Sequence, residues 1–169
     1  NHSCFARMAI IAATLIMMGC NSSSPEKMMA SAKEYLEKDD PAAAIIQIKN
    51  VLNKDSNSPE ARLLLGRALL ESGDPVAAEL ELRKAIDLKI SAGQVTPPLA
   101  RALMAQGKAK KVIDELASTP TANAEELAEL KTVVAQSHIM LANIESAKTT
   151  FNEALAAKPH YAPAQLGLA

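Results

Sequence analysis

The chain has 169 residues, of which 49% are hydrophobic and 22% charged, and its 18 Lys and Arg nearly balance its 19 Asp and Glu. This length and composition give about one domain with a sizeable core, which excludes a disordered or supercharged protein and argues against nucleic acid as a partner. Aromatic residues are only 2% with no Trp, so rings for base stacking or sugar binding are scarce. The bias toward alanine and leucine predicts an all-α chain.

The N-terminal segment is typical of a secretion signal. An uninterrupted apolar run of 11 residues extends from Met8 to Met18 and is preceded by Arg7. This run is shorter than the about 20 residues that a membrane-spanning helix needs, but it has the length of the apolar region of a signal peptide. The sequence therefore predicts a signal peptide over residues 1–19. The alternative is a buried helix followed by an ordinary core thiol.

The end of the apolar run resembles a bacterial lipobox. Gly19 precedes Cys20, although a lipobox more often has Leu where this sequence has Met17. The resemblance implies that Cys20 is lipidated and becomes the mature N-terminus, that residues 20–24 form a flexible tether, and that the chain is anchored in the envelope of a Gram-negative bacterium. Asn21, in place of the aspartate typical of inner-membrane retention, implies the outer membrane, facing the periplasm.

From residue 24 onward the sequence repeats itself every 34 residues. Ser24-Pro25-Glu26 recurs as Ser58-Pro59-Glu60, and Asp40-Pro41 recurs as Asp74-Pro75. A second step of 34 carries Arg67 onto Arg101, and a fourth unit follows one residue later. Sequence periods of this length are typical of solenoids, in which each unit packs mainly against its neighbours.

Each unit predicts a pair of helices, because Ser-Pro-Glu and Asp-Pro each supply a cap and a proline suited to the first helical turn. The expected helices span 25–37 and 41–52, 59–72 and 75–88, 97–106 and 109–116, and 124–141 and 144–157. Pro97 and Pro98 should shorten the third pair, because neither can donate a helical hydrogen bond. Residues 25–169 thus predict about four helix pairs and the start of a fifth, in a chain expected to be truncated at both ends.

These units resemble the tetratricopeptide repeat family. The second unit is the clearest, with large and small residues where that family places its helix contacts: Leu65, Gly66, Leu69, Ala78, Leu82 and Ala85. Small residues let two helices approach closely while leucines fill the space between them. The chain departs from the family in lacking Trp, in having Ile90 where Pro is common, and in having Val112 where Ala is common. The resemblance implies a right-handed α-solenoid of antiparallel helix pairs.

A narrower resemblance is carried by AIIQIKNVLNKD (44–55), by residues 61–88 and by LARALMAQGK (99–108). Together with the lipobox, they look like the N-terminal part of the tetratricopeptide lipoproteins of the PEP-CTERM and exosortase system. This implies an envelope-anchored interaction scaffold that assists exopolysaccharide production or protein sorting. The alternative is that the chain is a non-catalytic spacer region of a larger envelope enzyme or polysaccharide-assembly subunit.

The family's geometry implies that first helices line a concave groove that holds a peptide or helix of a partner protein. Groove residues would be Lys33, Arg67, Arg101 and Gln136, one per unit. Apolar neighbours would be Met29, Leu36, Leu63, Leu70, Met104 and Ile139. A basic column beside apolar side chains suits a carboxylate-bearing segment. The alternative is that these cations are ordinary charges on exposed helix faces.

No enzyme, metal site or cofactor is predicted, because the chain has no Gly-rich phosphate loop, HExxH, CxxC or GxSxG motif. His138 is expected to be a packed residue at a helix interface. Two charged clusters have simple interpretations as an acidic helix start and a solvated basic surface: Glu125, Glu126 and Glu129, and Lys108, Lys110 and Lys111. A metal or acid–base cluster and a lipid or glycan contact are the respective alternatives.

Overall fold

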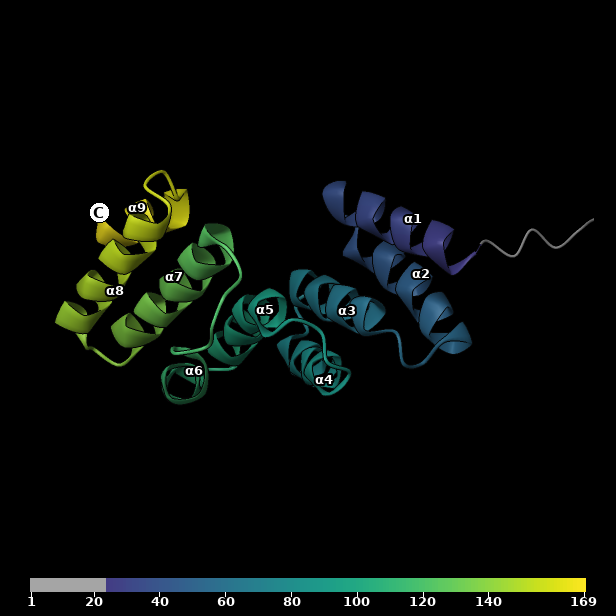
Figure 1. The fold of residues 1–169 in the computed structure, drawn as a ribbon, viewed down its shortest axis with the longest axis horizontal. Helices are drawn as coiled ribbons and strands as arrows, with labels where there is room; N and C mark the ends of the chain where they lie inside the picture. The colour runs from purple at the N-terminus through teal and green to yellow at the C-terminus, as the bar shows by residue number, and fades with distance from the viewer. Residues whose placement is uncertain (1–23) are drawn as a thin grey trace, which may run out of the picture.

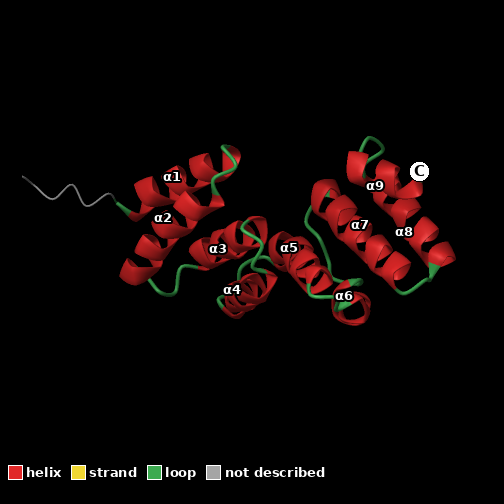
Figure 2. Cartoon of the chain, turned by 180° about the vertical axis from the view of Figure 1, so that it is seen from behind, coloured by secondary structure: helices red, strands yellow, loops and turns green. Residues whose placement is uncertain are grey.

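The computed structural model describes residues 24–169, and every element in that part of the chain is a helix (Figure 1, Figure 2). The helices are α1 (Pro25–Glu37), α2 (Pro41–Lys54), α3 (Pro59–Glu71), α4 (Pro75–Asp87), α5 (Ala92–Ala105), α6 (Ala109–Leu116), α7 (Ala124–Met140), α8 (Ile144–Ala157) and α9 (Ala162–Leu168). The predicted signal peptide and Cys20 lie outside the described residues. Within the described range, none of the helices combines the length and apolar character needed to span a membrane.

The helices form pairs that stack side by side. Contacts join α1 to α2, α3 to α4, α5 to α6 and α7 to α8, and further contacts join each pair to the next. In Figure 1 the pairs follow an arc, with α1, α3, α5 and α7 toward its inner side and α2, α4 and α8 toward its outer side. The predicted all-α solenoid of antiparallel helix pairs is confirmed.

Local capping starts the first two pairs where the repeated motifs predict. Ser24, Asp40, Ser58 and Asp74 each accept a hydrogen bond from the backbone N–H three residues on, at 3.4, 3.0, 3.3 and 3.0 Å. A proline follows each cap in the first turn. Because these signals are local, helix starts in the first two units follow directly from the sequence.

The prediction that Pro97 and Pro98 shorten the third pair is wrong. Helix α5 begins at Ala92 and carries both prolines in its interior. Pro98 cannot donate to the carbonyl of Gln94, and the Arg67 side chain donates to that oxygen instead, with Nη2 at 3.4 Å. Both prolines are buried, so packing between units outweighs the lost helical hydrogen bonds.

Small residues set how closely α3 and α4 approach. Ala78 and Ala85 are fully buried, as is Leu82. A Cβ atom added to Gly66 would lie 2.5 Å from Cγ of Leu82, whereas carbon atoms in contact are about 3.5–4.0 Å apart. Only glycine therefore fits at this crossing without displacing the core.

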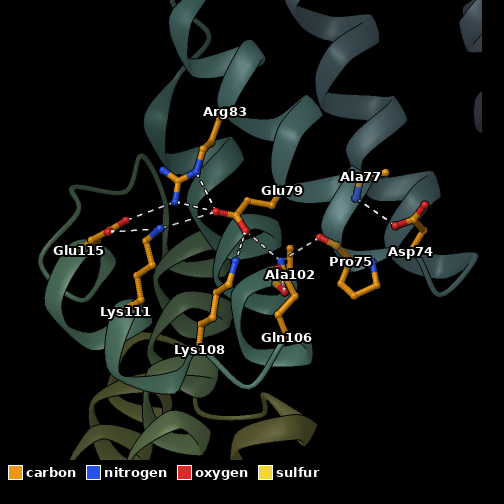
Figure 3. Close-up of polar contacts among 10 residues, drawn as sticks. All are labelled: Asp74, Pro75, Ala77, Glu79, Arg83, Ala102, Gln106, Lys108, Lys111 and Glu115. Atoms are coloured by element: carbon orange, nitrogen blue, oxygen red, sulfur yellow. Dashed lines mark hydrogen bonds and ion pairs between the residues drawn. The ribbon is translucent and has the colours of Figure 1, made fainter.

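A polar cluster around Glu79 joins the second unit to the third (Figure 3). The Glu79 carboxylate accepts hydrogen bonds from Lys108 Nζ and Gln106 Nε2, both at 2.9 Å, and from Arg83 Nε at 3.0 Å. Burial opposes ionisation, but these hydrogen bonds and the charge of Lys108 outweigh it and lower the pKa of Glu79 from 4.5 to about 2. The cluster thus holds α4 against the end of α5 and the start of α6.

The predicted basic surface is balanced by acids. Besides the Lys108 contact, Lys110 Nζ is 2.8 Å from Asp114 Oδ2, and Lys111 Nζ is 3.7 Å from Glu115 Oε1. The three lysines are exposed or half-buried. They are therefore ion-paired as well as solvated, and this surface presents little free positive charge.

Replacing Gly66 with Ala should destabilise the fold by about 1–3 kcal/mol, because the added methyl group overpacks the contact with Leu82. A Gly-to-Ala change inside a helix ordinarily stabilises by about 0.5–1 kcal/mol, so the expected sign is reversed. Urea unfolding of the variant, with the exposed Glu71→Ala as control, measures the effect. A midpoint at or above that of wild type would show that α3 and α4 do not meet at Gly66.

Replacing Glu79 with Gln should destabilise the protein by about 1–2 kcal/mol at pH 7, because hydrogen bonds to a charged acceptor whose side chain is only 13% exposed are weakened. Since the folded pKa of about 2 lies below the ordinary value of 4.5, the carboxylate's contribution is complete above pH 4.5 and is lost as the pH falls toward 2. The difference in unfolding free energy between the two proteins should therefore shrink in acid. An unchanged difference from neutral to strongly acidic pH would contradict the cluster, and Glu37→Gln is the matched exposed control.

Candidate functional site

The inner side of the arc carries a row of three pockets. The first pocket, of about 200 Å³, lies between α1, α3 and the start of α5. The second, of about 260 Å³, lies between α3, α5 and α7, and the third, of about 510 Å³, extends from α5 and α7 to α9. Arg67 lines the first two pockets, while Leu70 and Arg101 line the second and third. The pockets therefore adjoin one another, and we name them together the first-helix groove.

The four residues predicted to face the groove line it in chain order. Lys33 and Arg67 line the first pocket, Arg67 and Arg101 the second, and Arg101 and Gln136 the third. Their role in binding stays a prediction. Of the expected apolar neighbours, most line the pockets: Met29, Leu63, Leu70 and Met104. Leu36 instead packs against the core beneath α1, and Ile139 is exposed outside the pockets.

Each groove cation lies near the start of the next first helix. Arg101 Nη1 is 3.4 Å from Glu129 Oε1, and the Arg67 contact reaches the Gln94 carbonyl of α5. In the first pocket, Lys33 shares the lining with Glu60. Arg67 and Arg101 thus help to join neighbouring units. The groove lining balances three bases with three acids: Lys33, Arg67 and Arg101, and Glu60, Glu71 and Glu129. This balance fits a segment with both signs of charge better than a purely acidic one.

Two residues of the third pocket, Glu129 and Tyr161, are not among the predicted groove residues. Glu129 was assigned to a solvated helix start, yet its side chain is only 29% exposed and pairs with Arg101. The spacing carried a signal, because Glu129 occupies the same place in its unit as Glu60 does in the second. Tyr161, between α8 and α9, also lines this pocket. Burial, followed by the charges of Glu129 and Glu125, raises the pKa of Tyr161, while Arg101 opposes this effect.

The other candidate residues have structural roles. Glu126 accepts the backbone N–H of Ala122 at 2.9 Å and donates its own N–H to Asn123 Oδ1 at 2.9 Å, as expected for a helix start. Glu125 pairs with Lys158. His138 is half-buried in α7, and its Nδ1 has no hydrogen-bond partner among the described residues. In the part of the chain that the structure describes, no group of three or more His, Cys, Asp or Glu side chains is placed to hold a metal ion.

Comparison with known proteins agrees with the fold. Residues 35–89 match the sequence model described as tetratricopeptide repeat. Among solved structures, MamA is 20% identical over 82% of this chain and 75% of its own, with a TM-score of 0.65. PilF of Pseudomonas aeruginosa is 18% identical over 85% of this chain and 65% of its own, with a TM-score of 0.72.

A third solved structure, YrrB, is described as a tetratricopeptide protein with an unusual peptide-binding site. It is 12% identical over 86% of this chain and 92% of its own, with a TM-score of 0.54. The search of curated proteins gave no match. Residues 35–89 thus match the tetratricopeptide repeat, and the described chain shares its fold with these solved structures.

Proposed function

We propose that the chain is a protein-interaction scaffold whose first-helix groove binds a segment of a partner protein. The observation that carries the proposal is the row of three joined pockets across successive units, with Leu63, Leu70 and Met104 contributing apolar surface. A small-molecule site is usually one enclosed cavity, whereas a row of open pockets suits an elongated ligand with several side chains. The peptide-binding site ascribed to YrrB supports this reading.

Binding in this groove would use two kinds of contact. Apolar side chains of the partner would enter the pockets, while its charged groups would meet Arg67, Arg101 and the acids opposite them. Charge-assisted hydrogen bonds are worth about 1.5–3 kcal/mol when water is excluded, and less at an exposed rim. The cations therefore contribute most where a bound segment covers them.

We also propose that lipidated Cys20 holds this scaffold at the periplasmic face of the outer membrane. The support is the lipobox resemblance and the Ser-rich stretch that follows it. The narrower family resemblance supports a role in exopolysaccharide production or in PEP-CTERM and exosortase-linked sorting. In that setting the groove would recruit a protein of the same envelope pathway.

Replacing Cys20 with Ser should abolish incorporation of labelled fatty acid, because the thiol that carries the lipid is removed. Metabolic labelling of cells that express the full chain measures this directly, with Cys4→Ser as the matched control. Persistent labelling of the Cys20→Ser protein would refute the anchor. Fractionation of the labelled wild type with the inner membrane would refute only the outer-membrane assignment.

Replacing Arg67 and Arg101 together with Ala should weaken binding of a groove ligand about tenfold or more. Both side chains are exposed and make only long contacts of 3.4 Å, so stability should change by no more than about 0.5 kcal/mol per site. The ligand is the best binder selected from a random peptide library displayed against the full chain.

Isothermal titration at low and high salt compares wild type, the groove double variant and a control double variant on outer helices, Lys49→Ala with Lys148→Ala. The proposal expects a loss in the groove variant that is larger at low salt, and no loss in the control. Equal affinities for all three proteins would show that the groove cations are ordinary surface charges with no role in binding. A library that yields no binder would count against the groove as a peptide site.

A further inference from the structure

The turn between the two helices of a unit occurs four times with the same backbone. Each turn contains one residue with positive φ: Asp39 at 58°, Gly73 at 82°, Gly107 at 74° and Ala142 at 59°. In each, the next residue donates its N–H to the carbonyl five residues earlier, at 2.8–2.9 Å: Asp40 to Tyr35, Asp74 to Leu69, Lys108 to Leu103 and Asn143 to His138. Because the backbone is the same in all four turns, the side chains that differ between them are not needed to form the turn.

The fourth turn differs from the others in its chemistry. The first two read Glu-Lys-Asp-Asp-Pro (37–41) and Glu-Ser-Gly-Asp-Pro (71–75), the third reads Ala-Gln-Gly-Lys-Ala (105–109), and the fourth reads Met-Leu-Ala-Asn-Ile (140–144). Four large apolar side chains are exposed there, by 44% at Ile139, 53% at Met140, 41% at Leu141 and 49% at Ile144. We name these four residues the apolar corner. Exposed apolar groups that cluster, unlike scattered ones, are typical of interaction sites.

The fourth turn is also unfavourable for the free protein. Ala142 has a left-handed backbone where the second and third turns have glycine, the residue that adopts this conformation without a steric penalty. Ile144 opens α8 where the first two units place proline in the first turn. Neither Ala142 nor Ile144 is needed to form the turn, so we attribute these residues to binding and not to stability.

The apolar corner continues the first-helix groove. Met140 belongs to the corner and also lines the third pocket, together with Leu70, Met104 and Val133. The last residue of each first helix changes along the groove, from Glu37 and Glu71 through Ala105 to Met140. These helix ends therefore change from acidic in the first two units to apolar in the fourth.

We infer that the apolar corner binds the apolar end of the same partner segment that the first-helix groove holds. This inference rests on the proposed function. The segment has consecutive apolar side chains where it crosses the corner of the fourth unit. A basic side chain of the segment lies near Glu71, whose exposed carboxylate lines the second pocket.

Two observations favour a protein segment over other occupants. The lysines of the adjoining third unit are paired with Glu79, Asp114 and Glu115, so this edge offers little attraction to an anionic lipid surface. Four side chains that are each about half exposed present roughly a few hundred Å², which is below the about 800 Å² per partner of a standard stable interface. A second copy held by the corner alone would therefore dissociate, whereas a segment already in the groove gains from the added contact.

The test replaces the fourth turn by the chemistry of the second: Met140→Glu, Leu141→Ser, Ala142→Gly and Ile144→Pro in one full-length protein. The second unit already folds with these residues at the same places, so the melting temperature should equal or exceed that of wild type. A smaller variant, Met140→Glu with Leu141→Ser, leaves the backbone residues unchanged and serves if the complete replacement fails to fold.

The probe is the library-selected peptide, titrated against wild type, the turn replacement and the Arg67→Ala with Arg101→Ala variant. The inference expects the turn replacement to weaken binding about tenfold or more without loss of stability, and expects removal of the peptide's apolar end to have the same effect on wild type alone. If the groove variant weakens peptide binding but the turn replacement does not, the apolar corner does not bind the peptide. The proposed function would then still stand. Unchanged binding in both variants would overturn both.

Lipid binding is tested in the same series. The Cys20→Ser chain is floated with vesicles of phosphatidylethanolamine and phosphatidylglycerol. Failure to float is the expected result. Flotation that the turn replacement abolishes would identify the corner as a lipid-binding surface and overturn the assignment to a protein segment.

Discussion

The close approach of paired helices at small residues is the constraint on which the structure depends. Gly66 lets α3 and α4 meet, and the buried Ala78 and Ala85 extend that contact along α4. A single pair leaves apolar faces uncovered, so the pairs must stack to bury them. Because the contact recurs at a fixed period, equivalent positions of successive first helices face the same side, and a groove results without any dedicated element.

Polar contacts between units then decide how much of the groove charge remains for a partner. Arg67 and Arg101 each reach the following first helix, while Glu79 joins the second and third units on their outer part. The groove contacts are long and exposed, so a bound segment can replace them at little cost. The Glu79 contacts are shorter and more buried, which suits a structural role.

Local rules predicted most of the fold, and contacts between units account for what they missed. The caps at Ser58 and Asp74 lie beside the helices that they start, so helix pairs follow from the sequence. The start of α5 does not follow from the sequence, because the burial of Pro97 and Pro98 outweighs the helical hydrogen bonds that these prolines cannot donate. The four groove positions came from the repeat period, which also aligns Glu129 with Glu60. Tyr161 reaches the third pocket through the stacking of later units, which a single-unit pattern does not contain.

The most direct test of groove binding is a map of amide chemical-shift changes in the ¹⁵N-labelled chain when the library-selected peptide is added. If a partner segment lies along the first helices, the changes follow α1, α3, α5 and α7 and continue into the turn after α7. Amides in the middle of α2, α4 and α8 then stay close to their free positions. Changes concentrated on those outer helices, with α3 and α5 unaffected, would contradict binding in the groove.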